Sequence, residues 1–416
     1  MPVSIRVAVV GGGAAGMLAA GMAAMQGASV TLYEKNERLG RKLRITGKGR
    51  CNVTNDCDRQ TLLQNVLRNP RFLYSALAQF DCQDTVRFFE GLGVPLKTER
   101  GNRVFPASDR AEDIVDALRR FLESVGVTVV HRTVTGVATK DGAVCGVKMG
   151  AHTEPYDRVI VATGGRSYPQ TGSTGDGYRF ARECGHTVVA QRPSLVPVEV
   201  EERDCGAMMG LSLKNVTLSL WDTETNSEQF CEMGEMLFTH FGLSGPLVLS
   251  ASTHMTKMPL SRYQLRLDLK PALDEKTLDA RLQRELAENA NRNFSNMLET
   301  LLPKKMIDHF VVRVGIAPDR KCHSITRTER GQILRLCKQM TFTVRALRPI
   351  SEAIVTAGGV SVGEVDPKTM RSKCTEGLYF AGEILDIDAY TGGFNLQLAF
   401  STAYAAGMAA GSEDQK

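Results

Sequence analysis

The first forty residues separate into two apolar strands with a helix of small residues between them. Val7–Val10 is a continuous apolar run, and a second run, Ser29–Glu34, follows the helix and ends on an acid. Short continuous apolar runs are typical of parallel strands buried on both faces of a sheet. The turn after the first strand reads Gly11-Gly12-Gly13-Ala14-Ala15-Gly16. The pattern predicts the start of an α/β fold of the Rossmann-like, doubly wound type.

Later apolar runs predict that distant segments complete the same sheet. Arg158–Val161 leads into Ala162-Thr163-Gly164-Gly165, and a short run at 377–381 leads into Gly382 and Glu383. Both runs are short and end in glycine, as buried parallel strands do when their loops approach a ligand.

The segments between these strands have mixed patterns. Residues 59–92 predict two or three short helices, and Ser108 and Asp109 are predicted to cap an amphipathic helix that continues through Leu122. A strand is expected at 127–130, and residues 133–149 alternate and turn at Asp141-Gly142, which predicts a hairpin.

The pattern changes near Pro193. Short alternating segments at 196–200, 211–221 and 263–269 predict a small β-structure, and charged helical stretches follow at 273–289, 296–315 and 326–339. A strand at 342–344 leads back to the first fold. We therefore predict a discontinuous nucleotide-binding domain of residues 1–193 and 346–416, and an inserted domain of residues 194–345 that covers the reactive end of a cofactor.

Composition narrows the class of protein. The chain has 416 residues, 43% of them hydrophobic, and a net charge of +5 from 51 basic and 46 acidic residues. This charge is too mild to argue for nucleic acid. No run of eighteen apolar residues exists, so we expect no membrane span. None of the ten cysteines forms a C-x-x-C pair, which favours a reduced, cytoplasmic protein without a metal site.

The glycine turn carries the first functional signal. Gly11, Gly13 and Gly16 occupy the G-x-G-x-x-G positions, which allow a tight turn, a close backbone approach to a pyrophosphate and close packing of helix on strand. Glu34 lies 21 residues beyond Gly13, where a carboxylate accepts hydrogen bonds from a ribose diol. A turn needed only for packing would not explain the acid. We predict a dinucleotide site.

A basic loop follows this unit. Residues 40–55 contain five cations and three glycines, and Arg41, Lys42 and Arg50 are expected to offset the charge of phosphates. A solvated basic loop is the alternative interpretation. Cys51 has no second cysteine at disulfide-exchange spacing, so packing or contact with a cofactor ring is expected of it rather than redox chemistry.

Three later segments offer further chemistry. Residues 167–178 form a polar glycine-rich loop that contains Tyr168, and either a plain loop or a pocket lining explains it. His240 lies within Leu237–Pro246 and is a candidate proton donor, although a lone histidine is more often packed or exposed. Residues 392–395 open a C-terminal helix expected to end near Gly407, and its N-terminus supplies N–H donors for a reduced ring.

These motifs together resemble a known family. The N-terminal fingerprint, the strand ending at Gly165 and the late Tyr379–Glu383 segment resemble the FAD-binding pattern of the glutathione-reductase-like flavoproteins. More narrowly, Thr46–Asn55, Gly164–Gly175, Leu237–Pro246 and Gly382–Gln397 resemble the BaiN/YhiN-type flavoproteins, nearly end to end. That resemblance implies bound FAD, a discontinuous FAD domain, and an inserted domain that combines a β-barrel with helices.

The resemblance also implies which residues hold the cofactor. Its residues for the pyrophosphate, the adenosine, the ribityl chain and the flavin ring map onto Gly11, Gly13, Ala15, Gly16, Glu34, Lys35, Arg41, Lys42, Gly49, Arg50, Cys51, Asn52, Val134, Thr163, Gly164, Gly382, Glu383, Asp386, Gly393, Phe394 and Asn395. Val134 is placed by position only, as a backbone partner for adenine. Many members have glycine where this chain has Lys48.

The expected activity is that of a flavin-dependent oxidoreductase. A single fingerprint leaves no dedicated NAD(P)H domain, so NAD(P)H is expected to bind transiently over the flavin and to reduce a small organic substrate. Tyr168, Thr239 and His240 are the candidate catalytic groups on the substrate side. The alternatives are an amine or amino-ketone oxidase, an FAD-dependent tRNA-modifying protein, which the weak charge argues against, and a regulatory flavoprotein without turnover. The sequence leaves the oligomeric state open.

Overall fold

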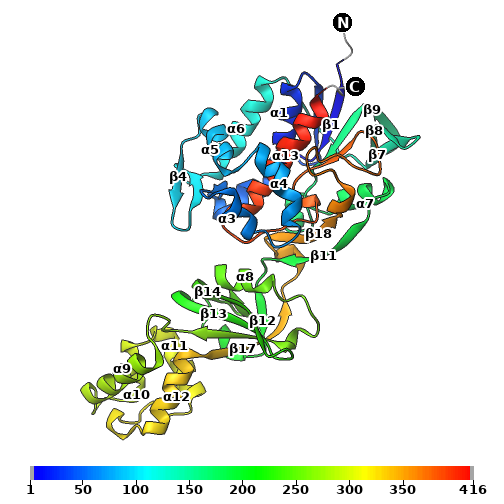
Figure 1. Cartoon of the computed structure of the whole chain (residues 1–416). Helices are drawn as coiled ribbons and strands as arrows, with labels where there is room; N and C mark the ends of the chain where they lie inside the picture. The colour runs from blue at the N-terminus through cyan, green and yellow to red at the C-terminus, as the bar shows by residue number, and fades with distance from the viewer. Residues whose placement is uncertain (1–3, 413–416) are drawn as a thin grey trace. The chain divides into compact units, whose positions relative to one another are not determined.

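The computed structural model describes residues 4–412, which fold into two compact units (Figure 1). The first unit runs to Ser194 and resumes at Ile350, and the second unit is Leu195–Pro349. Each unit has its own hydrophobic core. The chain therefore leaves the first unit once and returns to it once.

A five-stranded parallel sheet forms the centre of the first unit. Its order is β19-β10-β1-β2-β6, and its strands are β1 (Arg6–Val10), β2 (Ser29–Glu34), β6 (Thr128–His131), β10 (Arg158–Val161) and β19 (Leu378–Phe380). Strands from the beginning, the middle and the end of the sequence thus lie side by side. Because all five are parallel, their carboxyl ends meet at one edge of the sheet. The Rossmann-like fold class is confirmed.

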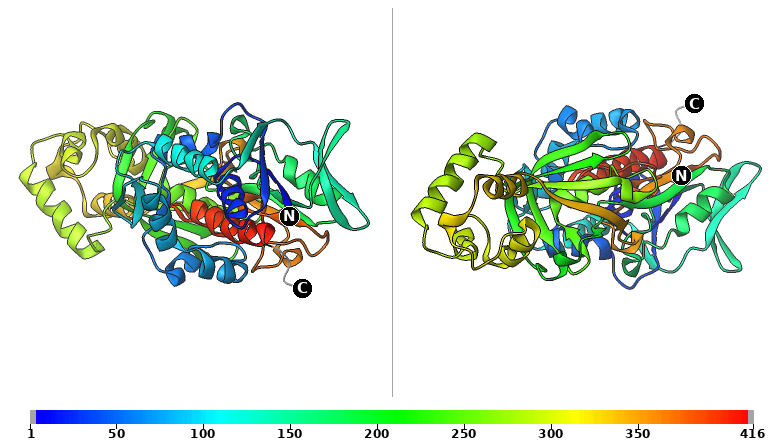
Figure 2. Two further views of the ribbon diagram at one scale, coloured as in Figure 1. Left: turned by 90° about the horizontal axis from the view of Figure 1, so that it is seen from above. Right: turned by 90° about the horizontal axis from the view of Figure 1, so that it is seen from below.

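Two helices of small residues pack together against this sheet. They are α1 (Ala14–Met25) and α13 (Phe394–Gly411), which run side by side in Figure 2, dark blue and red. A Cβ on Gly407 would stand 2.5 Å from the carbonyl oxygen of Ala19, so glycine at this position permits the close approach. The contact brings the first and last helices of the chain into one core.

The remaining elements of the first unit surround these layers. The helices are α2 (Arg41–Ile45), α3 (Arg59–Gln64), α4 (Tyr74–Gln79), α5 (Cys82–Gly91), α6 (Ala111–Ser124) and α7 (Asp176–Glu183). Three small antiparallel sheets are β3 (Thr54–Asn55) with β4 (Leu96–Glu99) and β5 (Arg103–Pro106), β7 (Gly136–Lys140) with β8 (Ala143–Met149) and β9 (His152–Pro155), and β11 (Val188–Ser194) with β18 (Val355–Val360). The predicted hairpin at 133–149 is confirmed.

Two local predictions for this unit were wrong. Helix α6 begins at Ala111 with Arg110 at its N-cap and no side-chain cap, because Asp109 adopts a φ of 58° and turns toward the side chains of Arg50 and Lys97. The basic segment after Gly40 is not a plain loop, since its first five residues form α2. At the start of α6, the contacts of Asp109 with distant residues replaced the predicted cap. After Gly40, a short helix formed where the sequence predicted a loop.

The second unit is a closed six-stranded barrel with helices, as the family resemblance implied. The barrel order is β12-β15-β14-β13-β16-β17, from β12 (Val198–Val200), β13 (Ser212–Asp222), β14 (Ser227–Phe238), β15 (Gly242–Ser244), β16 (Tyr263–Asp268) and β17 (Met340–Leu347). The helices are α8 (Pro246–Ser252), α9 (Glu275–Glu288), α10 (Phe294–Met297), α11 (Lys304–Val314) and α12 (Arg327–Lys338). The single helix predicted at 296–315 is interrupted before Pro303, the N-cap of α11. Among the described residues, no helix has the length and apolar character needed to cross a membrane.

Acid is expected to weaken the barrel at Asp222. Arg262 donates to both oxygens of this carboxylate at 3.0 and 2.8 Å and, with the backbone N–H groups of Thr225 and Glu224, lowers the pKa of Asp222 to about 2. An unfolded aspartate titrates near about 3.9. The pair therefore contributes stability above this pH, and that contribution is lost as the pH falls toward 2. In thermal unfolding, the difference between the wild type and Asp222→Asn should be present at pH 5 and vanish near pH 2; a constant difference would contradict this assignment.

Candidate functional site

The glycine turn after β1 lies against two other segments at the carboxyl edge of the sheet. A Cβ on Gly11 would stand 2.5 Å from the oxygen of Ala162, and one on Gly16 would stand 1.7 Å from the oxygen of Gly11. A Cβ on Gly382 would stand 2.8 Å from the Cβ of Ala15. Three predicted site segments, at 11–16, 162–164 and 382–383, therefore meet at this edge.

Gly13 differs from its neighbours. It has an ordinary φ of −84°, and a Cβ built on it would meet nothing within 4 Å. Neither backbone conformation nor packing in the protein requires glycine here. Gly13 is also the N-cap of α1, which has neither a side-chain cap nor an acid in its first turn. An anion approaching the free N–H groups of this helix supplies the missing reason for glycine.

Glu34 closes β2 beside this turn. Its Oε2 accepts from the N–H of Gly12 at 2.8 Å, and its Oε1 accepts from the backbone and side-chain N–H groups of Asn36 at 2.8 and 2.6 Å. The residue is 8% exposed. A carboxylate has about four acceptor positions, so Oε2 retains one for a ribose hydroxyl. The turn and the acid are thus fixed to each other.

A partly buried network joins the basic segment to the turn that follows β19. Lys42 donates to Ser167 at 2.7 Å and to Glu383 at 2.6 Å, and Ser167 donates to Glu383 at 3.0 Å. Glu383 also accepts the N–H of Thr356 at 2.9 Å. The predicted residues Lys42 and Glu383 are therefore brought together. Ser167 belongs to the polar loop at 167–178, which the sequence left open as a plain loop or a pocket lining, whereas Thr356 of β18 joins the network without any sequence signal.

The other predicted cations have protein partners. Lys35 donates to Thr174 and Asp176 at 2.6 and 2.7 Å, which ties β2 to α7. Arg41 donates to Asn36 at 2.7 Å, next to Glu34. Arg50 pairs with Glu99 and Asp109 and lies over the ring of Phe105. Lys35 and Arg41 thus lie close to the dinucleotide turn, whereas Arg50 is anchored to β4 and to the segment before α6.

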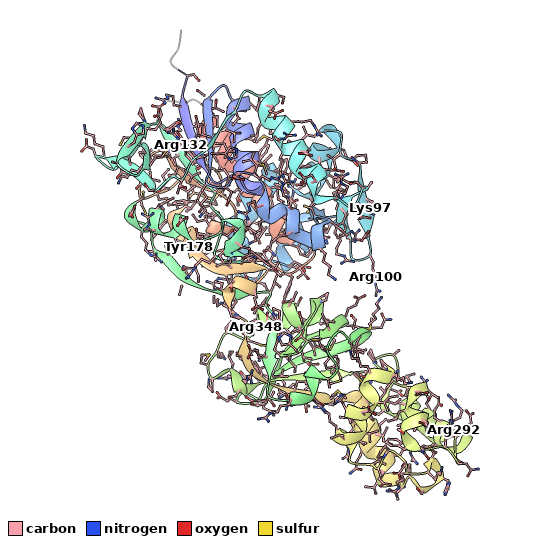
Figure 3. All side chains as sticks on the ribbon, turned by 180° about the vertical axis from the view of Figure 1, so that it is seen from behind. Lys97, Arg100, Arg132, Tyr178, Arg292 and Arg348 are labelled. Carbon is pink, nitrogen blue, oxygen red and sulfur yellow. The ribbon has the colours of Figure 1, made fainter. Side chains whose placement is uncertain are left out.

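Two buried hydroxyls next to the sheet edge have no hydrogen-bond partner among the described residues. They are Thr163 Oγ1, directly after β10, and Tyr178 Oη, in α7 (Figure 3). Burial raises the pKa of Tyr178, and Glu383 adds to the shift. Buried hydroxyls are normally hydrogen-bonded. Orphaned hydroxyls beside three converging loops fit a polar ligand that passes between them.

The last of the predicted cofactor segments, residues 393–395, forms the N-terminus of α13. In the amide orientation that hydrogen bonding favours, Asn52 Oδ1 accepts the N–H of Gly393 at 2.9 Å. The Asn395 side chain accepts the backbone N–H of Ala389 at 2.9 Å and donates to the carbonyl oxygen of Ala389 at 2.7 Å. The Asn395 side chain is thereby occupied and positions the preceding loop. The helix has no side-chain cap and no acid in its first turn, which leaves its positive end for a ligand.

Cys51 is sealed inside the first unit. The residue is 0% exposed, and burial raises the pKa of its thiol to about 12. The nucleophilic thiolate is therefore negligible at neutral pH.

Iodoacetamide should label the exposed Cys145 and Cys231 in the native protein and reach Cys51 only after denaturation, as peptide mass spectrometry would show. Labelling of native Cys51 at the rate of Cys145 would contradict this burial.

The three catalytic candidates lie in different units. Tyr168 belongs to the first unit, where burial and then Glu352 raise its pKa. Thr239 and His240 form the turn between β14 and β15 in the second unit. Thr239 Oγ1 accepts the N–H of Gly242 at 3.2 Å, and His240 is exposed with its ring edge against Phe241. Their role in catalysis stays a prediction.

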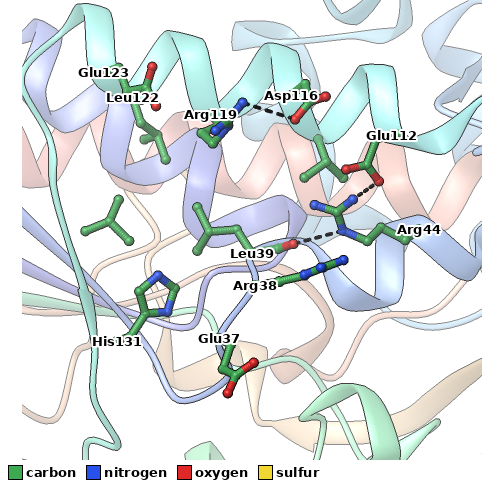
Figure 4. A pocket seen from close by; sticks show the side chains of 12 residues that line it. Glu37, Arg38, Leu39, Arg44, Glu112, Asp116, Arg119, Leu122, Glu123 and His131 are labelled. Carbon is green, nitrogen blue, oxygen red and sulfur yellow. Dashed lines mark hydrogen bonds and ion pairs between the residues drawn. The ribbon is translucent and has the colours of Figure 1, made fainter.

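One surface pocket of about 570 Å³ opens near the end of β2 (Figure 4). Its lining comes from residues 37–39, α6 and β6, and includes Arg44, which is paired with Glu112. None of the predicted cofactor residues lines this pocket. Arg44 and Arg119 in its lining are already paired with Glu112 and Asp116, so we place the cofactor at the glycine turn rather than there.

Comparison with known proteins decides the family. The model of the HI0933-like protein Rossmann domain matches residues 5–409. The chain belongs to this family. The HI0933-like family is the BaiN/YhiN-type group that the motifs indicated, so that resemblance is confirmed. Its members have an FAD-binding Rossmann fold and are flavin oxidoreductases, and the cradle at Gly13 with the orphaned hydroxyls of Thr163 and Tyr178 fits such a cofactor.

Curated relatives cover nearly the whole chain. The chain is 32% identical over 415 residues to the 3-dehydro-bile acid delta(4,6)-reductase of Clostridium scindens, covering 97% of this chain and 98% of that protein. It is 30% identical over 406 residues to the ribosomal RNA dihydrouridine synthase of Haemophilus influenzae, covering 96% and 97%. A solved 3-ketosteroid-delta4-(5alpha)-dehydrogenase of Rhodococcus jostii has a TM-score of 0.49 at 14% identity, with 98% and 97% covered.

Proposed function

We propose that this HI0933-like protein is an NAD(P)H-dependent, FAD-containing reductase of carbon–carbon double bonds conjugated to a carbonyl group. The observation that carries the proposal is the pair of full-length relatives, whose names describe very different substrates. A 3-oxo steroid with 4,6 double bonds and a uracil base nevertheless share one reactive unit, a C=C bond conjugated to C=O. Dihydrouridine is uridine with that bond reduced.

The fold suits such a reduction. When bound, FAD supplies the two-electron chemistry, taking a hydride equivalent from a donor and delivering it to an acceptor. The protein's part is to hold that group and to stabilise negative charge, which the uncapped N-termini of α1 and α13 can do, together with Arg41, whose partner Asn36 is neutral. The sequence has one full dinucleotide fingerprint, so NAD(P)H is expected to bind transiently.

The roles of the catalytic candidates follow from this reaction class. Addition of hydride to the β-carbon leaves an enolate, which must receive a proton at the α-carbon. Tyr168 and His240 are the candidate proton donors, and Thr239 is a candidate hydrogen-bond donor to the substrate. These assignments are proposals that single substitutions test, by a loss of substrate reduction with unchanged reduction of the flavin by NAD(P)H.

Stopped-flow mixing without oxygen tests the proposed function. NADH or NADPH should bleach the flavin absorbance, and 2-cyclohexenone, a minimal conjugated enone, should restore it, with cyclohexanone as the product. Cyclohexene, which lacks the carbonyl, is the matched control and should not restore it. A flavin that NAD(P)H leaves oxidised, but that an amine or amino ketone bleaches, would instead support the oxidase alternative.

A uridine in ribosomal RNA is the second candidate substrate. The relative from Haemophilus influenzae favours it, and so does the distribution of charge along the chain. Residues 273–339, which contain α9–α12, have 13 lysines and arginines against 9 acids, so this segment has +4 of the net +5. Arg292 marks the segment in Figure 3. Lysines and arginines that concentrate in one part of a protein are the usual electrostatic footprint for RNA.

Protein-free ribosomal RNA separates the two candidates. The protein is incubated with NADPH and this RNA without oxygen, and nucleosides are then analysed by mass spectrometry. Dihydrouridine formation that falls steeply with salt would support the RNA substrate, because phosphate contacts release counterions. Enone reduction without any dihydrouridine would support the small organic substrate.

A further inference from the structure

The loop between β19 and α13 contains two buried acids, Asp386 and Asp388, that face two arginines. One pair is complete: Arg68 donates to both oxygens of Asp386 at 2.7 and 2.8 Å. Asn69 adds a donor to the backbone oxygen of Asp386 at 2.6 Å. Both carboxylate oxygens of Asp386 therefore have an arginine donor.

The second pair is incomplete. Asp388 is 1% exposed, and its Oδ2 accepts from Ser194 at 2.7 Å, but its Oδ1 has no hydrogen-bond partner among the described residues. The buried Nη1 of Arg192 has none there either, and no ion pair joins it to Asp388. Burial raises the pKa of Asp388 and lowers that of Arg192, while each charge opposes the shift of the other. Ser194, which binds Asp388, lies two residues after Arg192 in β11, so the Arg192 and Ser194 side chains point to the same face of the strand. This cluster therefore contains a buried acceptor and a buried donor that are both unused.

The Asp388 member of this pair is fixed relative to the start of α13. The carbonyl oxygen of Asp388 accepts the N–H of Leu67 at 2.8 Å, and the next residue, Ala389, is held by the Asn395 side chain. Arg192 lies in β11, opposite Ala357 of β18. The start of α13 is where we expect the pyrimidine edge of the flavin. Asp388 is therefore anchored to the segment expected to meet the reacting ring.

We propose that Arg192 and Asp388 together bind an imide edge, in which a carbonyl oxygen stands next to an N–H group. Arg192 Nη1 donates to the carbonyl oxygen, and Asp388 Oδ1 accepts from the N–H. Two molecules of the proposed function carry this edge at N3: the flavin ring itself and a uracil base. The uracil source rests on the proposed function, whereas the flavin source rests only on FAD binding. An enone without an N–H group satisfies Arg192 alone.

Two substitutions test the pair, one of them isosteric. Asp388→Asn replaces the acceptor by a donor and keeps an oxygen for Ser194, and Arg192→Gln removes the guanidinium. Asp116→Asn and Arg119→Gln are the matched controls, since these residues form a single long contact of 3.5 Å on α6. The first readout is the affinity of the apoprotein for FAD. The second is the affinity of the holoprotein for uridine, measured by the change in the flavin absorption spectrum. Loss of a charged hydrogen bond should weaken the relevant binding about 10- to 100-fold.

Methylated ligands test the wild type without any substitution. If the flavin occupies the pair, both variants bind FAD more weakly and the wild type prefers FAD over 3-methyl-FAD. If uracil occupies it, FAD binding is unchanged, both variants lose uridine, and the wild type discriminates against 3-methyluridine. Either pattern supports the proposal. If Asp388→Asn does not fold, the preference of the wild type for the unmethylated ligand tests the proposal instead. Unchanged binding of both ligands in both variants, with no discrimination by the wild type, would overturn it. Failure of enone and RNA reduction alone would refute the proposed function and leave the flavin arm of this test intact.

Discussion

Gly13→Val is expected to purify as a folded protein that contains no flavin. A Cβ at Gly13 meets no protein atom within 4 Å, so the valine side chain can occupy the space where the phosphates are expected. A change at this helix N-cap costs about 1 kcal/mol of stability. Loss of two charged hydrogen bonds to a pyrophosphate should weaken FAD binding more than about 100-fold. Titration of the apoprotein with FAD, followed by fluorescence quenching, measures this effect.

Gly331→Val is the matched control for this substitution. Gly331 lies in α12 of the second unit, and a Cβ there also meets nothing within 4 Å. The control should keep full FAD content and a similar unfolding temperature. Equal FAD affinity in Gly13→Val and Gly331→Val would show that the phosphates do not approach the first turn of α1.

Arg68→Leu is expected to destabilise the first unit by about 3 kcal/mol. Asp386 has a side chain only 6% exposed, and without Arg68 its one remaining side-chain donor among residues 4–412 is Asn69 at 3.2 Å. A buried charge that loses its partner costs several kcal/mol, because nothing repays its desolvation. Thermal unfolding of the full chain should show the loss as a lower midpoint of the first unit.

Arg87→Leu provides the comparison for this prediction. Arg87 also pairs with an aspartate, Asp84 at 2.6 Å, but its side chain is 68% exposed. Exposed pairs contribute about 0 to 1 kcal/mol. A double variant, Arg68→Leu with Asp386→Asn, should recover part of the loss because no buried charge remains unpaired. Equal midpoints for Arg68→Leu and Arg87→Leu would refute the importance of the buried pair.

Sequence patterns predict those parts of the fold in which several neighbouring residues follow the same repeat of apolar and polar positions or the same spacing of glycines. Continuous apolar runs located β1, β2, β10 and β19, and alternation located the hairpin of β7 and β8. The spacing of the glycines, together with Glu34 at the end of β2, located the dinucleotide turn. In each case, local pattern and tertiary packing require the same conformation.

The parts that the sequence did not predict depend on contacts between distant residues. Ser167 and Thr356 complete the Lys42–Glu383 network across about 190 residues of chain, and no local pattern predicted that they meet. The cap of α6 was misplaced because Asp109 turns toward Arg50, which is 59 positions away. Arg192 and Ser194 lie in a strand whose local pattern says nothing about Asp388. Such contacts become visible only when the fold brings distant strands and loops together.

The FAD content of the purified protein tests the central claim most directly, namely that separated segments of the first unit enclose one adenine–flavin molecule. The protein is denatured, and the released cofactor is identified and quantified by chromatography against the protein concentration. The account predicts a yellow protein with FAD, rather than FMN, close to one per chain. A colourless protein that takes up no FAD when the cofactor is added would contradict it.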